Sequence, residues 1–391
     1  MWRSVYVPSV MLAIGEGMLV PVLPLYVAAL GAPFWLVGLV LAAESLGMLI
    51  GDVPAGALLR RLDRKVTMLV GVAVVGTAVT AMAFVDGVVA VLLLRLLAGL
   101  GAALWGISRH AFLTTAVPAP QRGRAIAAFG GAQRVGLLAG PALGGVVAAT
   151  AGYDAAFLTY GAIAVAAFAV CAVFLERAQR PSAVPTRHVG SFAAIAAVVR
   201  EHRRILVVAG AGQFMAQGIR SGRKIVLPLY GATVLGLSVE QVGLIVSIGA
   251  AFDVALFPLA GWVMDRYGRK HAIVPSFLLQ AVGMALVPLA GGFLGLAAAA
   301  ALIGFGNGLS SGTMMTVASD LAPEDAVGEF IGVWRLVGDG GSMGGPVAVG
   351  ALADLLSLPL ATVAIAAVGV GAALTFAYGV PETRRAPAPA A

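Results

Sequence analysis

An acidic residue lies deep inside the first apolar stretch of the chain. Glu16 is the only charged residue in the segment 5–30. In a helix that rises about 1.5 Å per residue, its carboxyl lies roughly 17 Å from the start of the segment. Desolvation at that depth favours the protonated form, so the carboxyl can exchange between a proton and a cationic ligand. The residue predicts a proton carrier, with a permanent ion pair as the alternative.

Basic residues also lie inside apolar stretches. Arg220, Arg223 and Lys224 stand at positions i, i+3 and i+4, which places them on one face of a helix. They favour a substrate that is anionic, zwitterionic or neutral over a purely cationic one. For Arg223 and Lys224 the alternative is that the side chains snorkel outward to the membrane surface. Such charges need partners, so we expect an internal polar network. Other charges within or beside apolar segments include Glu44, Asp52, Arg95, Arg134, Asp253, Arg335 and Asp339.

The composition identifies the setting of these charges. Of 391 residues, 60% are hydrophobic and 11% are charged, and the mean hydropathy is +0.98. This excludes an ordinary soluble enzyme, a disulfide-rich scaffold and a disordered regulator. A membrane helix needs about 20 apolar residues. The sequence predicts twelve of them, at 5–30, 34–58, 67–85, 88–116, 125–150, 155–175, 205–234, 240–263, 271–291, 293–318, 328–352 and 357–380.

The distribution of basic residues predicts the orientation in the membrane. Eighteen of the 25 Lys and Arg residues fall in the tails and in alternate loops, and none falls in the other loops. Cytoplasmic loops carry such an excess, so both termini are expected in the cytoplasm. The net charge of +7 follows from this bias and gives no reason to expect nucleic acid.

The chain contains two repeats. Residues 23–26 recur as 227–230, and Arg64-Lys65 recurs as Arg269-Lys270, at an offset of 204 or 205. We therefore predict an N-terminal bundle at 1–175, a basic cytoplasmic linker at 176–204, and a C-terminal bundle at 205–391. Two parallel repeats around a central site are typical of alternating-access transporters. The same offset relates Glu16 to Arg220, so Arg220 is a candidate partner of Glu16 across the cavity.

The linker allows two interpretations. Residues 191–199 either form a short amphipathic helix on the membrane surface or belong to a solvated basic segment.

The loop at 261–270 has a specific pattern. It reads GWVMDRYGRK and resembles the G-x-x-x-D-R-x-G-R-K loop of the major facilitator superfamily. Within it, Asp265 is expected to pair with an Arg or a helix N-terminus and to favour one state of the cavity; a purely topogenic basic loop is the alternative. The equivalent loop at 56–65 departs from the pattern, since Arg60 and Asp63 replace the family's Asp and Gly. The predicted gating residues are Gly261, Asp265, Arg266, Gly268, Arg269, Lys270, Arg64 and Lys65.

Further motifs resemble the 12-span drug:proton antiporters of that superfamily. Residues 136–145 match the G-x-x-x-G-P-x-x-G-G signature through Gly136, Gly140, Pro141, Gly144 and Gly145. These glycines let helices pack closely and the proline bends the helix, which is expected to serve as a hinge. The segment 95–101 resembles R-x-x-Q-G-x-G with Ala98 in place of Gln, and the resemblance links Arg95 to proton coupling, with a structural hydrogen-bond hub as the alternative. Residues 381–384 resemble the family's P-E-T ending.

The resemblance implies an all-α membrane protein with two pseudo-symmetric six-helix bundles. The predicted function is export of small amphipathic molecules or drugs in exchange for protons, across the inner membrane, by a monomer without enzymatic chemistry, cofactor or metal. A porter for a defined metabolite, such as a sugar, amino acid or siderophore, is one alternative, and a non-transporting membrane sensor is another. The expected substrate-cavity residues are Glu16, Glu44, Arg220, Arg223 and Lys224, and the expected proton-coupling residues are Glu16, Arg95 and Arg220.

Overall fold

The protein is almost entirely helical. A computed structural model describes residues 5–61, 63–116, 122–175 and 192–384, which leaves 176–191 of the linker and 385–391 of the tail outside the described residues. The N-terminal half contains α1 (Val7–Ala29), α2 (Phe34–Arg61), α3 (Arg64–Ala81), α4 (Val88–Ala116), α5 (Arg122–Ala151) and α6 (Tyr153–Phe174). The C-terminal half contains α8 (Arg203–Leu229), α9 (Val239–Arg266), α10 (Arg269–Leu286), α11 (Phe293–Leu309), α12 (Thr313–Leu321), α13 (Val327–Leu355) and α14 (Leu358–Leu374). Between the halves lies α7 (Phe192–Glu201), so the linker does contain a short helix.

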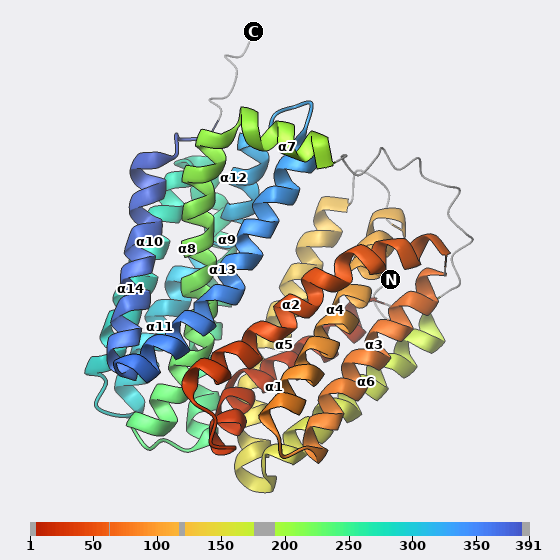
Figure 1. The fold of residues 1–391 in the computed structure, drawn as a ribbon, viewed down its shortest axis with the longest axis vertical. Coiled ribbons are helices and arrows are strands. Elements are labelled where there is room, and N and C mark those ends of the chain that lie inside the picture. The colour runs from red at the N-terminus through yellow and green to blue at the C-terminus, as the bar shows by residue number, and fades with distance from the viewer. Residues whose placement is uncertain (1–4, 62, 117–121, 176–191, 385–391) are drawn as a thin grey trace.

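Ten helical segments of the described residues are long and apolar enough to cross a membrane. Of the twelve predicted spans, α8 and α13 do not meet that standard, although they run alongside the others (Figure 1). Both carry charges within their length, notably Arg220, Arg223 and Lys224 in α8, and Arg335 and Asp339 in α13. Charged helices of this kind normally face the interior of a bundle rather than lipid.

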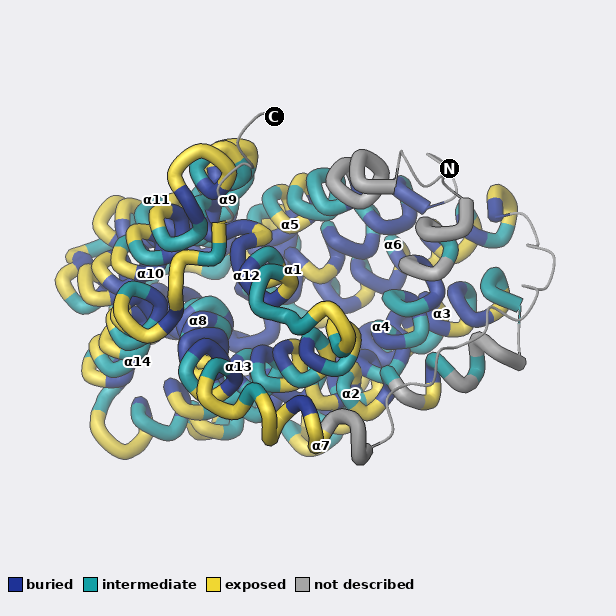
Figure 2. The backbone as a smooth tube through the Cα atoms, turned by 90° about the horizontal axis from the view of Figure 1, so that it is seen from above, coloured by how far each residue is buried: buried dark blue, intermediate teal, exposed yellow. Residues whose placement is uncertain are grey.

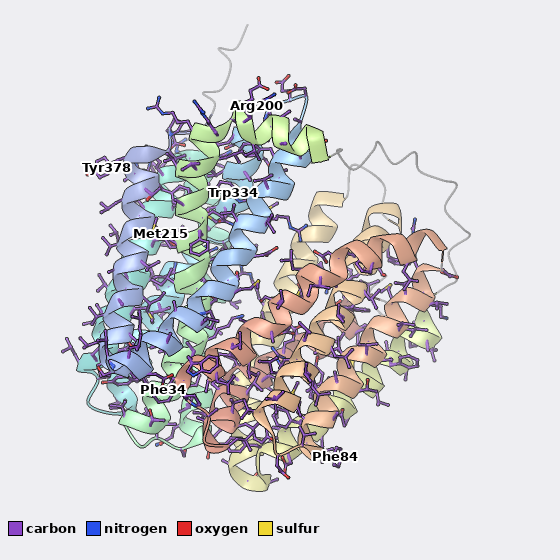
Figure 3. The ribbon with its side chains drawn as sticks, viewed as in Figure 1. Phe34, Phe84, Arg200, Met215, Trp334 and Tyr378 are labelled. Carbon is purple, nitrogen blue, oxygen red and sulfur yellow. The ribbon has the colours of Figure 1, made fainter. Side chains whose placement is uncertain are left out.

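Apolar side chains cover the outside of both bundles. Leu294 is 81% exposed and Tyr378 is 86% exposed, and Figure 2 shows exposed residues concentrated on the outer faces. Figure 3 shows Phe84 and Tyr378 projecting from the periphery of opposite halves. Lipid chains are the natural solvent for such a surface.

The predicted repeat appears in equivalent hydrogen bonds. The Lys65 ammonium donates to the Ala172 carbonyl at 2.6 Å, and the Lys270 ammonium donates to the Ala377 carbonyl at 2.7 Å. Donor and acceptor are each displaced by 205 residues. The two halves therefore reproduce one another in local structure as well as in sequence.

The halves meet at the end that holds the loops 30–33, 235–238 and 356–357, which we call the closed end. There α2 packs on α13, and α5 packs on α9. Gly38 lies against the Pro346 carbonyl, and Gly243 lies against the Pro141 carbonyl. Figure 1 shows the ribbons of the two halves diverging toward the other end, which carries α7. We call the set of close main-chain contacts the seam; it comprises Phe34, Gly38, Pro141, Gly145, Gly243, Pro346 and Gly350.

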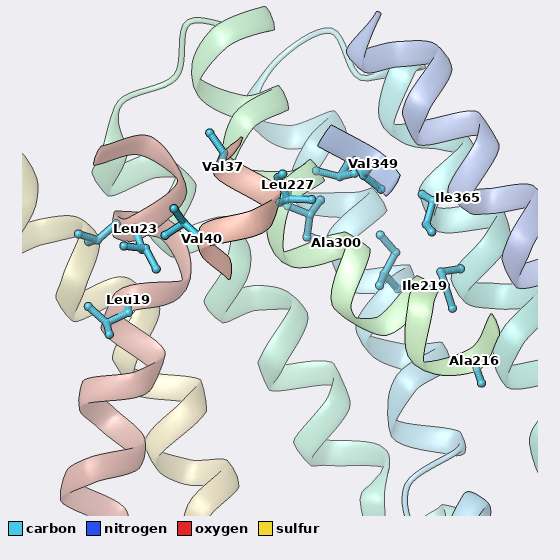
Figure 4. Close-up of a cluster of buried hydrophobic side chains, with 14 of the residues drawn as sticks. Leu19, Leu23, Val37, Val40, Ala216, Ile219, Leu227, Ala300, Val349 and Ile365 are labelled. Carbon is cyan, nitrogen blue, oxygen red and sulfur yellow. The ribbon is translucent and has the colours of Figure 1, made fainter. Parts of the chain in front are cut away.

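A carboxylate from one half caps a helix of the other half at the seam. The Asp354 carboxylate of α13 accepts hydrogen bonds from the main-chain N–H groups of Phe34 at 3.0 Å and Trp35 at 2.7 Å. These groups begin α2 and have no partner within the helix. Figure 4 shows apolar side chains gathered nearby, including Val37 and Val349. The closed end thus combines apolar packing with one charge-assisted cap.

The predicted span 293–318 is not continuous. It ends as α11 at Leu309 and resumes as α12 at Thr313, because Gly312 adopts φ +78°, which breaks the helix. The break places the buried Ser310 and Ser311 at the wall of the central cavity. The predicted span is confirmed, because Phe293–Leu321 is long and apolar enough to cross a membrane, but hydropathy carries no information on the single left-handed residue that breaks the helix.

The glycines of the antiporter signature pack α5 closely onto α1. Gly136, Gly140 and Gly144 lie against the main chain of α1 around Ile14 and Met18. A methyl group at Gly140 would approach the Gly17 Cα atom to 2.6 Å. This close approach holds the α1 residues that flank Glu16.

Substitution Gly140→Ala is expected to destabilise the protein. The added methyl group overlaps main-chain atoms that have no rotamer to change, and overpacking of this kind typically costs about 1–3 kcal/mol. Gly130→Ala in the same helix is the control, because no atom lies within 4 Å of its added methyl group. Thermal unfolding in detergent should show a lower midpoint for the first variant only. Equal midpoints would contradict the packing assigned to Gly140.

Candidate functional site

A cavity of about 600 Å³ lies between the two halves. Helices of both halves line it, chiefly α1, α2, α4 and α5 on one side, and α8, the α11–α12 break and α13 on the other. Its volume falls within the range of about 300–1,000 Å³ that is common for small-molecule sites. The six basic lining residues are Arg95, Arg109, Arg134, Arg220, Arg223 and Lys224, and the two acidic ones are Glu16 and Glu44.

Glu16 projects into this cavity from α1. Its side chain is exposed to the cavity, while Gly15 and Gly17 beside it are buried against Tyr160 and α5. No hydrogen bond or ion pair joins the Glu16 carboxylate to another described residue. The charged or titratable groups within electrostatic range of it are Glu44, Lys224, Arg109, Arg95 and Tyr160.

Arg95 is paired rather than free. Its guanidinium donates to the Glu44 carboxylate, which joins α4 to α2 within the N-terminal half. The Arg95 side chain is almost fully buried, so the ion pair supplies the acceptor that an intramembrane arginine needs. Close contact between Gly47 and Gly99 brings the two helices together beside this pair.

Arg220 does not pair with Glu16, and that prediction was wrong. Its guanidinium donates to the Ser310 carbonyl at 3.1 Å and to the Ser310 hydroxyl, and it lies 5.2 Å from the centre of the Phe277 ring. The helix break at 310–312 creates this acceptor site. The repeat offset located Arg220 correctly on the cavity wall, but the offset contains no information on the break that reorients its side chain.

Arg134 links the two halves. It donates to the Asp253 carboxylate at 2.8 Å and to the Ser311 hydroxyl at 2.7 Å, while Asn307 donates to the other Asp253 oxygen at 2.7 Å. Arg134 belongs to α5, and its partners belong to α9 and the α11–α12 break. This pair and Arg95–Glu44 form part of the expected polar network, whereas no ion pair joins Asp52, Arg335 or Asp339 to another described residue.

Arg223 and Lys224 remain without such partners. Both line the cavity from α8, and no hydrogen bond or ion pair joins them to another described residue. Lys224 is exposed to the cavity and lies within electrostatic range of Glu44 and Glu16. They do not snorkel to the protein surface; they face the cavity.

Comparisons with known proteins agree with this architecture. The sequence profile described as Major Facilitator Superfamily matches residues 7–221 and 209–391. The chain belongs to the Major Facilitator Superfamily. The double match reflects the two halves of the superfamily fold.

Two curated members of the superfamily span most of the chain. It is 22% identical over 348 residues to an MFS-type transporter of Methanocaldococcus jannaschii, covering 88% of this chain and 89% of the relative. It is 26% identical over 367 residues to the multi-drug resistance efflux pump PmrA homolog of Lactococcus lactis, covering 88% and 86%. A shorter match, 29% over 180 residues and 44% and 42% of the two chains, is the staphyloferrin B transporter of Staphylococcus aureus.

Solved structures of superfamily-like transporters share the fold. The nucleoside transporter NupG has a TM-score of 0.78 at 13% identity, covering 95% of this chain and 97% of its own. An inward-facing, occupied bacterial homolog of the human lysosomal transporter Spinster has a TM-score of 0.79 at 14% identity, covering 98% and 97%. At these identities the likeness concerns the fold alone.

The superfamily loop at 261–270 is held by the end of the chain. The Glu382 carboxylate accepts hydrogen bonds from the main-chain N–H groups of Arg269 at 2.9 Å and Lys270 at 3.1 Å, which begin α10. The Arg269 guanidinium binds Asp320 at 3.0 Å and Asp265 at 3.3 Å. The P-E-T ending therefore caps α10. The Asp265 carboxylate binds Arg269, four residues further along the chain, and the Asp265 side chain is 83% exposed.

Several residues of the site were not predicted from the sequence. Arg109 stacks over the Phe129 ring at 4.3 Å, and its position inside an apolar segment was the available signal. Ser310 and Ser311 belong to a G-x-S-x-G pattern that otherwise suggests a hydrolase nucleophile, and in this fold they serve as partners of arginines. Asp354 sits at a helix end, and nothing in the sequence indicates its partner across the seam.

Removal of the Glu382 charge should destabilise the protein in a pH-dependent way. Partial burial alone would raise the pKa of this carboxyl, but hydrogen bonds from main-chain N–H groups outweigh burial and hold the pKa below its usual value. The stabilisation is therefore complete above the usual pKa and disappears as the pH falls through the lowered one. Glu382→Gln should cost about 0.5–2 kcal/mol at neutral pH, as for other helix caps. Unfolding midpoints measured against pH should converge with wild type only in acid, whereas Glu324→Gln, at an exposed position, should match wild type throughout.

Proposed function

We propose that the protein exports small amphipathic molecules in exchange for protons, by alternating access of the central cavity to the two sides of the membrane. The observation that carries the proposal is the Glu16 carboxylate, which faces the cavity without a hydrogen bond or ion pair to another described residue. A carboxyl that must be held in one charge state is normally paired, as Glu44 is with Arg95. An unpaired one in a substrate-sized cavity is suited to gain and lose a proton during a cycle.

The arrangement of the halves supports the alternating-access part of the proposal. Contacts at the seam join the halves at one end, while the ribbons diverge at the other. We propose that the diverging end faces the cytoplasm, with both termini on that side of the inner membrane, because the basic loops and α7 lie there. The antiporter signature in α5 and the efflux pump among the relatives favour export. We propose a monomer as the transporting unit.

A porter for a defined metabolite is a second candidate. Six basic residues line the cavity against two acidic ones, which disfavours a purely cationic drug. The staphyloferrin B transporter among the relatives is in keeping with a metabolite substrate. Proton coupling through Glu16 is common to both candidates.

Replacement of Glu16 tests the proton-carrier role. Glu16→Gln keeps the shape of the side chain but cannot titrate, so transport driven by a pH gradient in proteoliposomes should fall to the level of empty liposomes. Substrate binding should survive with its pH dependence reduced. Glu201→Gln, in α7 and away from the cavity, is the matched control and should transport normally. Full pH-driven transport by Glu16→Gln would exclude Glu16 as the carrier.

The gating role of the 261–270 loop is a separate prediction. Asp265 lies outside the cavity, so Asp265→Asn should slow turnover while leaving substrate affinity within about twofold, since it changes a conformational equilibrium and no substrate contact. Asp325→Asn, in an exposed loop, is the control. Separate measurement of KM and the maximal transport rate distinguishes the two effects, and reduced affinity with normal turnover would refute the gating role.

A further inference from the structure

The charged residues of the cavity divide into two groups. Arg95, Arg134 and Glu44 are held in ion pairs, Arg220 is held by Ser310 and Phe277, and Arg109 stacks on the Phe129 ring. These side chains have defined partners and therefore a structural reason to be charged. The second group is Glu16, Arg223 and Lys224, which no hydrogen bond or ion pair joins to any described residue.

The second group contains opposite charges that face the same cavity without meeting. Glu16 projects from α1 of the N-terminal half, and Arg223 and Lys224 project from α8 of the C-terminal half. Lys224 lies within electrostatic range of Glu16, yet the two do not form an ion pair. Opposite charges in a protein interior attract strongly when water is excluded, so a gap between them invites a ligand that completes both interactions.

We propose that the substrate is a zwitterion: an amphipathic molecule whose acidic group binds Arg223 and Lys224, and whose amine binds Glu16. This inference rests on the proposed transport function and names the chemical class of its cargo. A ligand with only an amine would leave two cations unpaired in the cavity. A ligand with only an acid would leave the Glu16 carboxylate unpaired.

The surroundings of these groups suit the two ends of such a molecule. Arg223 follows Arg220 by one helical turn, so the acid-binding wall of α8 is strongly positive, and it offers the two-pronged recognition of a carboxylate that a guanidinium provides. Around Glu16 the lining is partly apolar, through residues such as Leu12, Leu19 and Trp105, which suits the body of an amphipathic molecule.

The proposal also explains how a proton would exchange for this substrate. The ammonium of the substrate and a proton compete for the same carboxylate, so protonation of Glu16 weakens the hold on the amine. The groups that face Glu16 and influence this competition are Glu44 of α2, Arg95 and Arg109 of α4, Tyr160 of α6 and Lys224 of α8.

A panel of matched probes tests the inference. Several apolar bodies, for example phenyl, indolyl and octyl groups, are each prepared as an amine, as a carboxylic acid and as an α-amino acid. Binding to the purified full-length protein is measured at neutral pH by calorimetry. The amino acid form of at least one body should bind at least tenfold more tightly than its amine and its acid. A panel in which no amino acid form binds, or in which an amine binds as tightly as its amino acid, overturns the proposal.

Variants assign each end of the probe. Arg223→Gln with Lys224→Gln should reduce the affinity for the amino acid form to that for the amine, whereas Arg223→Lys with Lys224→Arg should retain most of it. Glu16→Gln should reduce the affinity for the amino acid form to the affinity for the carboxylic acid form. It should also remove the loss of affinity at low pH. Unfolding midpoints show which variants are folded. If the double Gln variant does not fold, the variant that retains both charges still tests the assignment. Equal affinity of the neutral pair and wild type for the amino acid form contradicts the assignment.

The outcome separates this inference from the proposed function. If amino acid forms bind selectively but a pH gradient does not drive their transport, the substrate class stands and proton coupling falls. If a pH gradient drives transport of amines and amino acids alike, coupling stands and the zwitterion proposal falls.

Discussion

The cost of an ionised side chain away from water governs the arrangement of this molecule. A charge at the centre of a membrane helix costs about 2.5–3.5 kcal/mol even by moderate scales, so each must find a partner or face a polar cavity. Arg95 finds Glu44 within one half, and Arg134 finds Asp253 across the two halves. The helices that carry these residues are thereby oriented inward. The cavity is polar because these charged side chains line it. The lining charges without an ion-pair partner mark where a ligand could supply one.

Sequence reasoning succeeded where the signal is repeated or averaged over many residues. Hydropathy located the spans, and the offset of about 205 residues predicted two equivalent halves, which the matching hydrogen bonds of Lys65 and Lys270 confirm. It failed where one residue decides the structure. Gly312 breaks a helix that hydropathy reads as continuous, and this break redirects Arg220 to Ser310. Whether Arg95 meets Glu44 depends on how α2 and α4 are rotated about their axes, and no periodic pattern in a single sequence shows this rotation.

The repeat-related loops at 56–65 and 261–270 illustrate how a departure from a family pattern is compensated. In the second half Glu382 of the tail caps α10, and Gly268 adopts φ +113° to admit it. In the first half Asp63 stands in the glycine's place and caps α3 itself, by accepting from the Lys65 N–H group at 3.0 Å. The same need, a negative group at a helix N-terminus, is met from a distance in one repeat and locally in the other. The departure in sequence therefore changes the source of the cap and leaves its chemistry intact.

The seam is made largely of main chain, and this affects how the two halves can separate and rejoin. Gly38 and Gly243 meet the carbonyls of Pro346 and Pro141, so the touching surfaces hold few side-chain torsions. Surfaces without rotamers have a single shape, and they can part and rejoin without the repacking that interlocked side chains require. Two polar contacts lie beside the seam: the Asp354 carboxylate binds two N–H groups, and the Ser247 hydroxyl accepts from the Ala142 N–H group at 2.9 Å. These groups would each be hydrated on separation. In the proposed cycle such a seam separates and closes again without side-chain repacking, and its few polar contacts return the halves to the same register at every turnover.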